Sequence, residues 1–143
     1  MRQVFATVIC IAVIAGCASK SSYRIGASHE MSRADAERAL PGRISSATAV
    51  VGNLDSPPTA LHTALPAMPR DVIAKRTEGT VEAALLVDES GEVVEVTILK
   101  SPDPALSNAV LVALKQWQFA PMTASGRPTK VIMLQDIHFK VRQ

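Results

Sequence analysis

The sequence is poor in aromatic residues and in net charge. Aromatic residues make up 3% of its 143 positions, and 15 Lys and Arg against 13 Asp and Glu give a formal net charge of +2. Binding to a phosphate backbone needs an excess of positive charge, and stacking on unpaired bases needs aromatic side chains. The composition therefore argues against a nucleic-acid-binding protein, and the length corresponds to about one domain.

Residues that carry catalysis or hold metals are sparse as well. His29, His62 and His138 are scattered and lack the spacing of a metal site. The sequence contains no Gly-rich phosphate loop and no serine in a nucleophile elbow. Asp88 and Glu89 lie in an expected turn, where acidic residues are ordinarily solvated. We therefore expect no enzymatic activity, no metal and no cofactor.

The first 16 residues have the pattern of a secretory signal. Arg2 precedes the apolar run 4–15, which as a helix of about 18 Å is too short to cross a hydrocarbon core of about 30 Å. The run ends in the tetrapeptide IAGC at 14–17, which resembles the lipobox of bacterial lipoproteins. We expect residues 1–16 to be a cleaved signal peptide and Cys17 to become a lipidated N-terminus. The alternatives are an ordinary cleaved signal and a short uncleaved anchor.

This processing leaves no disulfide in the mature protein. Cys10 lies inside the signal, and a lipidated Cys17 has no free thiol. The expected location is the periplasmic side of a membrane. No Asp follows Cys17, which by resemblance to bacterial lipoproteins favours the outer membrane over the inner one.

The composition of residues 17–65 predicts a flexible tether. The stretch is rich in Ser, Ala, Arg and Pro and has no sustained hydrophobic periodicity. One short helix is expected within it, starting at a Ser32 cap and stopped by Pro41 and Gly42. A helix of one to two turns is marginal in isolation.

Residues 66–143 predict a small α+β domain. Thr80 to Asp88 alternates between apolar and other residues, and Val93 to Lys100 is a second β-branched run. Gly91 lies between them and supplies the turn of a hairpin. A short helix beginning near Pro69 precedes the hairpin.

A second helix and a last strand complete this domain. The helix begins at the Asp103 cap and is expected to end near Gln118. Its apolar stripe has helical spacing and consists of Leu106, Ala109, Val110, Ala113, Leu114 and Trp117. The last strand runs from Lys130 to Val141 and has only Asp136 as a charged residue in its middle. An apolar and poorly guarded edge strand is either an aggregation liability or a docking site.

Several motifs together resemble the C-terminal domain of TonB-type energy transducers over residues 66–142. They are Pro69 opening a helix, Glu78-Gly79-Thr80-Val81, Val87 to Val93, Leu106 to Leu114, Trp117-Gln118-Phe119-Ala120-Pro121, Gly126-x-Pro128 and Ile137-x-Phe139. The resemblance implies a three-stranded antiparallel sheet with two helices packed on one face. It also implies that the strand after Gly79 lies in the centre of that sheet.

The resemblance further implies a partner and a docking edge. In that family the domain recruits the TonB box, a short extended peptide at the periplasmic N-terminus of outer-membrane receptors, by adding it as a strand beside the last strand. By position, the corresponding residues are Val131, Ile132, Met133, Leu134, Gln135, Asp136 and Ile137. The alternative is a structural edge strand that binds nothing or pairs with its own copy in a dimer.

Three functional hypotheses remain open. The first is a periplasm-facing lipoprotein that acts as a TonB-like adaptor in receptor-linked transmembrane transport. The second is a structural or envelope-assembly lipoprotein that uses the same fold for homodimerisation or cell-wall contact. It is motivated by the fact that no histidine precedes His29, whereas energised family members carry one in a membrane-spanning N-terminal helix. The third is a full energy transducer with an uncleaved anchor.

Overall fold

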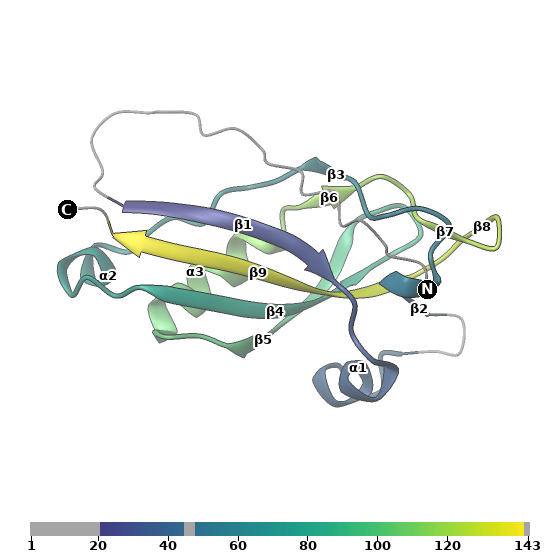
Figure 1. The fold of residues 1–143 in the computed structure, drawn as a ribbon, viewed down its shortest axis with the longest axis horizontal. Helices are drawn as coiled ribbons and strands as arrows, with labels where there is room; N and C mark the ends of the chain where they lie inside the picture. The colour runs from purple at the N-terminus through teal and green to yellow at the C-terminus, as the bar shows by residue number, and fades with distance from the viewer. Residues whose placement is uncertain (1–20, 45–47, 142–143) are drawn as a thin grey trace, which may run out of the picture.

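A computed structural model of the chain describes residues 21–44 and 48–141, so the expected signal peptide and Cys17 lie outside the described residues (Figure 1). Nine strands, three α-helices and one 3-10 helix follow one another along the described residues. In order they are β1 (Ser21–His29), α1 (Arg33–Ala39), β2 (Ala49–Val50), the 3-10 helix η1 (Val51–Asn53), β3 (Ala60–His62), α2 (Arg70–Ala74), β4 (Gly79–Val87), β5 (Val93–Lys100), α3 (Pro104–Leu114), β6 (Gln118–Phe119), β7 (Thr123–Ala124), β8 (Arg127–Pro128) and β9 (Val131–Val141).

The main sheet has five strands among the described residues. Its order is β1-β9-β4-β5, and β2 pairs with β9 at one end. All the pairs in the main path are antiparallel, whereas β2 runs parallel to β9. The two remaining pairs, β3 with β6 and β7 with β8, form small separate sheets.

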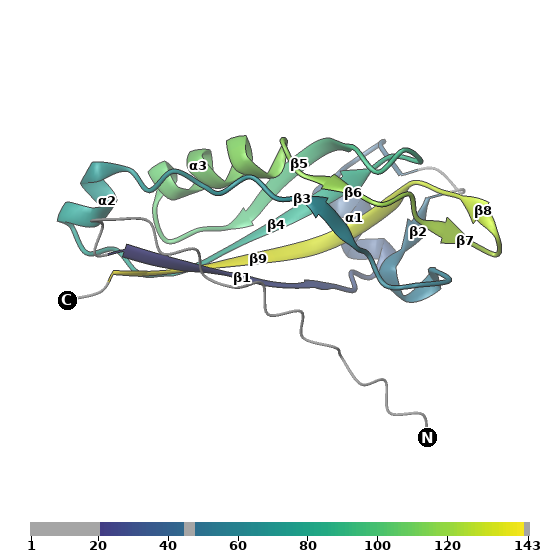
Figure 2. The same ribbon diagram turned by 90° about the horizontal axis from the view of Figure 1, so that it is seen from above.

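The first face of the main sheet carries the larger hydrophobic core. Helix α3 lies along this face with α2 at its end (Figure 2). Alternate residues of β4 point into the core because successive side chains of a strand face opposite sides. The buried residues of this cluster are Val72, Val81, Ala83, Leu85, Val87, Val96, Leu106, Val110, Leu114, Trp117, Phe119, Met122, Val131, Met133, Ile137 and Phe139.

The expected hairpin is confirmed, and its turn is tightly packed. Gly91 has a φ of 91°, and a Cβ at this position would overlap the carbonyl group of Phe119. The carbonyl oxygen of Gly91 also accepts a hydrogen bond from the N–H of Phe119 at 2.8 Å. Gly91 therefore serves both the left-handed turn and the close approach of a second backbone.

Helix α3 begins as expected but ends earlier. The Asp103 side chain accepts a hydrogen bond from the N–H of Ala105 at 2.8 Å and caps the helix. The helix was expected to continue to about Gln118, yet it ends at Leu114. The chain after it turns inward, where Trp117 is buried and its indole N–H donates to the carbonyl of Ala64 at 2.9 Å. Gln118 then belongs to β6, which pairs with β3.

The expectation of a flexible tether over 17–65 does not agree with the structure of its described residues. From Ser21 onward this stretch forms β1, α1, β2 and β3, which pair with or pack on the rest of the fold. The short helix α1 has the expected cap, since Ser32 accepts a hydrogen bond from the N–H of Asp35. The helix is stable in this context because Ala36 and Leu40 are buried against the second face of the sheet.

The fold therefore corrects the expected three-stranded sheet with two helices. Helices α2 and α3 do contribute to one core, and β4 does lie between two long antiparallel strands. However, β1 and β2 widen the sheet, and α1 adds a smaller core on the opposite face. That second cluster consists of Met31, Ala36, Leu40, Ala84, Leu86 and Ile132.

Candidate binding edge

The expected docking residues all lie in β9, but β9 is not an edge strand in the described chain. It lies between β4 and β1 (Figure 1). Five of the seven residues are buried, and the remaining two, Leu134 and Asp136, are partly buried. The poorly guarded edge that the sequence predicts is therefore covered by other parts of the same chain.

Two separate segments cover this edge. At its start, β2 pairs in parallel, with Ala49 opposite Val131 and Val50 opposite Ile132. From Leu134 onward, β1 pairs antiparallel, with His29 opposite Leu134 at one end of the ladder. Both covering segments come from the stretch that was expected to be a tether.

The pairing of β1 with β9 contains an irregularity. Ile25 lies opposite Ile137 and Ser28 lies opposite Gln135, so three steps along β1 correspond to two steps along β9. An extra residue in one strand of a pair is a β-bulge, which locally interrupts the ladder. Gly26 lies in this interval, and a Cβ there would come within 3.2 Å of the Cβ and the carbonyl oxygen of Asp136.

Gln135 fills the gap that the bulge leaves. Its side chain is 1% exposed and therefore needs hydrogen-bond partners. The amide oxygen accepts from the hydroxyl of Ser28 at 2.8 Å, and the amide nitrogen donates to the carbonyl of Gly26 at 2.7 Å. The nitrogen also donates to the main-chain carbonyl of Asp136 at 3.1 Å. Two of the three bonds thus depend on β1.

Polar side chains line the outer face of the same strands. His29 Nε2 lies 3.2 Å from Oδ2 of Asp136, which places a β1 side chain beside a β9 carboxylate. Further along β9, Nδ1 of His138 shares a hydrogen bond of 2.7 Å with the hydroxyl of Thr80 in β4. As expected, His138 is exposed. These contacts are surface polar contacts, and none of them brings catalytic groups together.

Two carboxylates elsewhere are held by local hydrogen bonds. The pKa of Asp55 is lowered from its ordinary value of 3.8, first by the N–H of Gly126 and then by Thr123 and the N–H of Ser125, against a smaller opposing effect of burial. In the hairpin turn, burial acts to raise the pKa of Asp88, yet hydrogen bonds from Ser90 and Glu92 outweigh it and the pKa is lowered. Both carboxylates stabilise turns.

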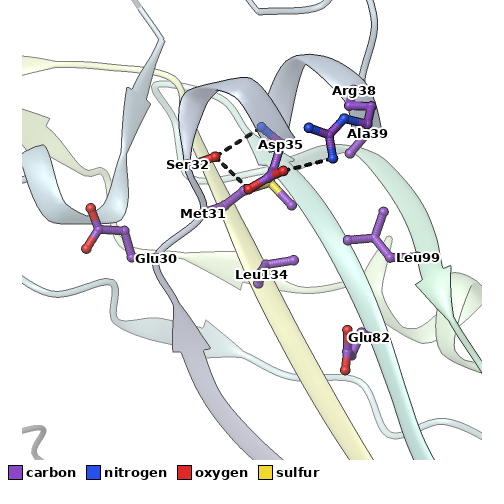
Figure 3. A pocket seen from close by; sticks show the side chains of 9 residues that line it. All are labelled: Glu30, Met31, Ser32, Asp35, Arg38, Ala39, Glu82, Leu99 and Leu134. Atoms are coloured by element: carbon purple, nitrogen blue, oxygen red, sulfur yellow. Dashed lines mark hydrogen bonds and ion pairs between the residues drawn. The ribbon is translucent and has the colours of Figure 1, made fainter.

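One pocket of about 390 Å³ opens where α1 meets the sheet (Figure 3). Acidic and basic side chains surround an apolar floor that includes Met31 and Leu134. The Asp35 carboxylate is already engaged, by the Ser32 hydroxyl at 2.6 Å and by Arg38 at 3.0 Å. The arrangement is that of a capped helix end, so we assign no chemistry to it.

The part of the chain that the structure describes also contains no group of three or more His, Cys, Asp and Glu side chains suited to a metal ion. Among these residues, no helix is long and apolar enough to cross a membrane.

Of the strands described, β5 pairs with β4 alone. Val94 and Leu99 of β5 are exposed.

Comparisons with known proteins identify the second part of the chain. The model of a family described as Gram-negative bacterial TonB protein C-terminal matches residues 64–141. No curated protein was found to match the chain. Among solved structures, the chain is similar to the TonB C-terminal domain of Pseudomonas aeruginosa, determined by solution NMR, with 26% sequence identity and a TM-score of 0.49 over 62% of this chain and 91% of that one. The matched residues include β9 but not β1, α1, β2 or β3.

Proposed function

Because the chain belongs to the family of Gram-negative bacterial TonB protein C-terminal domains, we propose that it recruits peptides from the N-termini of outer-membrane receptors by strand addition at β9. The family is a non-catalytic protein-interaction module of the periplasm and generally interacts with outer-membrane TonB-dependent receptors. Recruitment of a receptor by this chain would link it to transport across the outer membrane.

One observation carries this proposal, namely the place of β9 within the matched residues. If 64–141 are considered alone, the sheet order is β9-β4-β5, and β9 is an edge strand. The strands that cover this edge, β1 and β2, precede the matched residues. An edge strand offers its main-chain N–H and C=O groups to an added strand, and that mode of binding tolerates many side chains.

We also propose the anchoring that the N-terminal sequence predicts. Residues 1–16 form a lipoprotein signal peptide, Cys17 carries the lipid, and the family domain occupies 66–143. The protein then faces the periplasm from a membrane, the outer one in preference to the inner one. The lipobox resemblance supports this arrangement.

Site-specific photocrosslinking in a Gram-negative cell tests receptor binding. A photoreactive residue replaces His138 of β9, whose side chain is exposed one residue after the proposed docking residues, and in a matched control it replaces Val112, which is exposed on α3. We expect adducts with outer-membrane receptors from position 138 only. Equal adducts from both positions, or receptor adducts from neither, would contradict strand addition at β9.

Intact mass and membrane fractionation test the anchor. A lipidated N-terminus at Cys17 recovered with the outer membrane supports the adaptor. A full-length chain recovered with the inner membrane would instead support an energy transducer that keeps its N-terminal segment.

A second candidate is a structural or envelope-assembly lipoprotein that uses the fold for homodimerisation or cell-wall contact. The observation that favours it is the coverage of β9, because the chain itself already fills the edge that a receptor peptide would need. Receptor-dependent uptake in a deletion strain separates the two candidates. Normal uptake without the protein favours the structural role, whereas reduced uptake favours the adaptor.

A further inference from the structure

Gln135 is an unexpected residue in the strand that it occupies. Alternation along β9 places it on the core face with Met133, Ile137 and Phe139, which are all buried. A polar side chain at such a position is unfavourable unless its groups are hydrogen-bonded. Its partners include the Ser28 hydroxyl and the Gly26 carbonyl. Gln135 is therefore suited to a neighbouring strand of one particular local geometry.

The segment of β1 beside Gln135 shows what that geometry requires. Ile25 contacts the larger core, so an apolar residue is needed there. The next position must be small, because a Cβ on Gly26 would press against Asp136. A hydroxyl two residues later reaches the amide oxygen of Gln135. The following residue, His29, approaches the Asp136 carboxylate.

We infer that β1 is a displaceable strand that holds the β9 edge in place of a partner peptide, and that Gln135 recognises whichever strand lies there. The partner is an extended peptide that runs antiparallel to β9, as β1 does. Its sequence has an apolar residue, then Gly, then any residue, then Ser or Thr, then His or a basic residue. This inference rests on the proposed function, since it adds selectivity and regulation to the same edge.

Several features make β1 easier to release than β4 or β9. Each of those two strands pairs with a strand on both sides, whereas β1 pairs with β9 alone, and its ladder with β9 is interrupted at the bulge. Arg24 and His29 on it are exposed, and Ile25 is only partly buried. Elements with few buried apolar contacts open at lower free energy than the core. Local release of β1 therefore opens the β9 edge to a competing strand while β4 and β9 stay paired.

A reversible lock on β1 tests displacement. The full chain, with Cys10→Ser and Cys17→Ser, carries Arg24→Cys and His138→Cys at positions that are directly paired in β1 and β9. A matched control carries Glu82→Cys and Lys100→Cys, which are paired in β4 and β5. Paired positions in an antiparallel sheet are close enough for a disulfide. The probe is a fluorescent synthetic peptide with the sequence of β1 and the following residue, Glu30, SSYRIGASHE.

We call the chain with Arg24→Cys and His138→Cys the β1 lock, and we expect its reduced form to bind the peptide. Oxidation to the disulfide should lower the affinity for the peptide at least about tenfold, because the apparent affinity follows the fraction of molecules with an open edge. The control disulfide should leave binding unchanged. Equal binding to the oxidised and reduced β1 lock would overturn the inference, as would no binding to the reduced form. Formation of a dimer by exchange of β1 would also overturn it, because the occupant would then be a second copy.

Peptide discrimination tests the role of Gln135. The unsubstituted chain should prefer the parent peptide over one with Ala in place of its last Ser, which corresponds to Ser28, by about tenfold, the value of one good hydrogen bond. Gln135→Leu should abolish this preference, while Gln116→Leu, which alters an exposed glutamine of the α3 C-terminal turn, should keep it. A preference that survives Gln135→Leu would show that Gln135 does not recognise the strand.

A receptor peptide separates this inference from the proposed function. If the β1 peptide binds only the unlocked chain and receptor N-terminal peptides do not bind at all, the inference holds and receptor recruitment fails. If receptor peptides bind the oxidised β1 lock as well as the reduced one, receptor binding holds and displacement of β1 is wrong.

Discussion

The two flanks of β9 are built in different ways. On the β4 side, nine consecutive pairs run from Gly79 opposite Phe139 to Val87 opposite Val131 without a shift. On the β1 side, the ladder shifts between Ile25 and Ser28, and a buried glutamine amide bridges the interruption. The β4 flank is fixed by buried apolar side chains, such as Leu85 opposite Met133. The β1 flank depends more on hydrogen bonds, which another strand can supply.

The largest expected effect comes from truncating the apolar flank. Leu85 of β4 is fully buried, so Leu85→Ala should lower the free energy of unfolding by about 2–5 kcal/mol. Ile25→Ala in β1 should cost about 1 kcal/mol, because this side chain is only partly buried. Urea denaturation followed by circular dichroism measures both. Equal losses would show that β1 is as integral to the fold as β4.

Two glycines with positive φ extend the comparison to one turn of the family domain and one turn of the segment that precedes it. Gly91→Ala should lower the free energy of unfolding by about 2–4 kcal/mol, because the left-handed conformation and the overlap with the Phe119 carbonyl both oppose a Cβ. Gly42, after α1, has a φ of 70° and no atom within 4 Å of such a Cβ. Gly42→Ala should therefore cost only about 1 kcal/mol. Thermal denaturation distinguishes them, and a similar loss in both would refute the role given to close packing at the hairpin turn.

A smaller effect is expected at the contact between Ser28 and Gln135. Ser28→Ala removes the hydroxyl that donates a hydrogen bond to the buried amide oxygen of Gln135. The β1 amides should then exchange with solvent about five times faster, which corresponds to a loss of about 1 kcal/mol in local stability. The amides of β4 should keep their rates. Ser107→Ala, near the start of α3, is the control and should leave β1 unchanged. Uniform acceleration in both strands would mean that β1 opens only with the whole domain.

The smallest effect concerns pH and a contact between the two parts of the chain. Asp55 precedes the family domain and accepts the N–H groups of Ser125 and Gly126, each at 2.8 Å. Its pKa in the folded protein lies below the ordinary 3.8. The stabilisation is therefore fully present above that ordinary value and is lost as the pH falls through the folded pKa. Asp55→Asn should remove this acid-induced change from the amide NMR shifts of both residues.

The turn at Asp88 provides the control for this titration. Its pKa is also lowered, although by hydrogen bonds within the hairpin. Acid should affect this turn equally in the unsubstituted chain and in Asp55→Asn. If the Asp55 substitution leaves the titration of Ser125 and Gly126 unchanged, the carboxylate does not control that turn.

The family domain could be predicted in large part because its signals are local. The Asp103 cap, the turn at Gly91 and the alternation from Thr80 to Asp88 each depend on residues close in sequence, and the helix and hairpin they predict are confirmed. The predicted end of α3 was wrong because the indole N–H of Trp117 donates a hydrogen bond to the carbonyl of Ala64, which lies far away in the sequence.

The coverage of the β9 edge could not be predicted either, because it also depends on contacts between residues far apart in the sequence. The segment Ser21–His29 contains three serines and a glycine, so its apolar alternation is weak. It becomes a strand because β9 offers a partner, and Gln135 and Ser28 are 107 positions apart. Gln135 itself was included among the docking residues. Its polar side chain on the core face was visible in the sequence, but the role of that side chain can be understood only once the position of β1 is known.

The start of β1 has a consequence for how far the domain can travel. If Cys17 carries the lipid that we propose, residues 18–20 alone separate the lipid from the sheet, a chain length of about 10 Å. Release of β1 adds the residues up to Glu30, and thirteen residues, 18–30, reach at most about 45 Å. A peptide that takes the β9 edge would thus also lift the domain away from its own membrane, so occupancy of the edge and distance from the bilayer would change together.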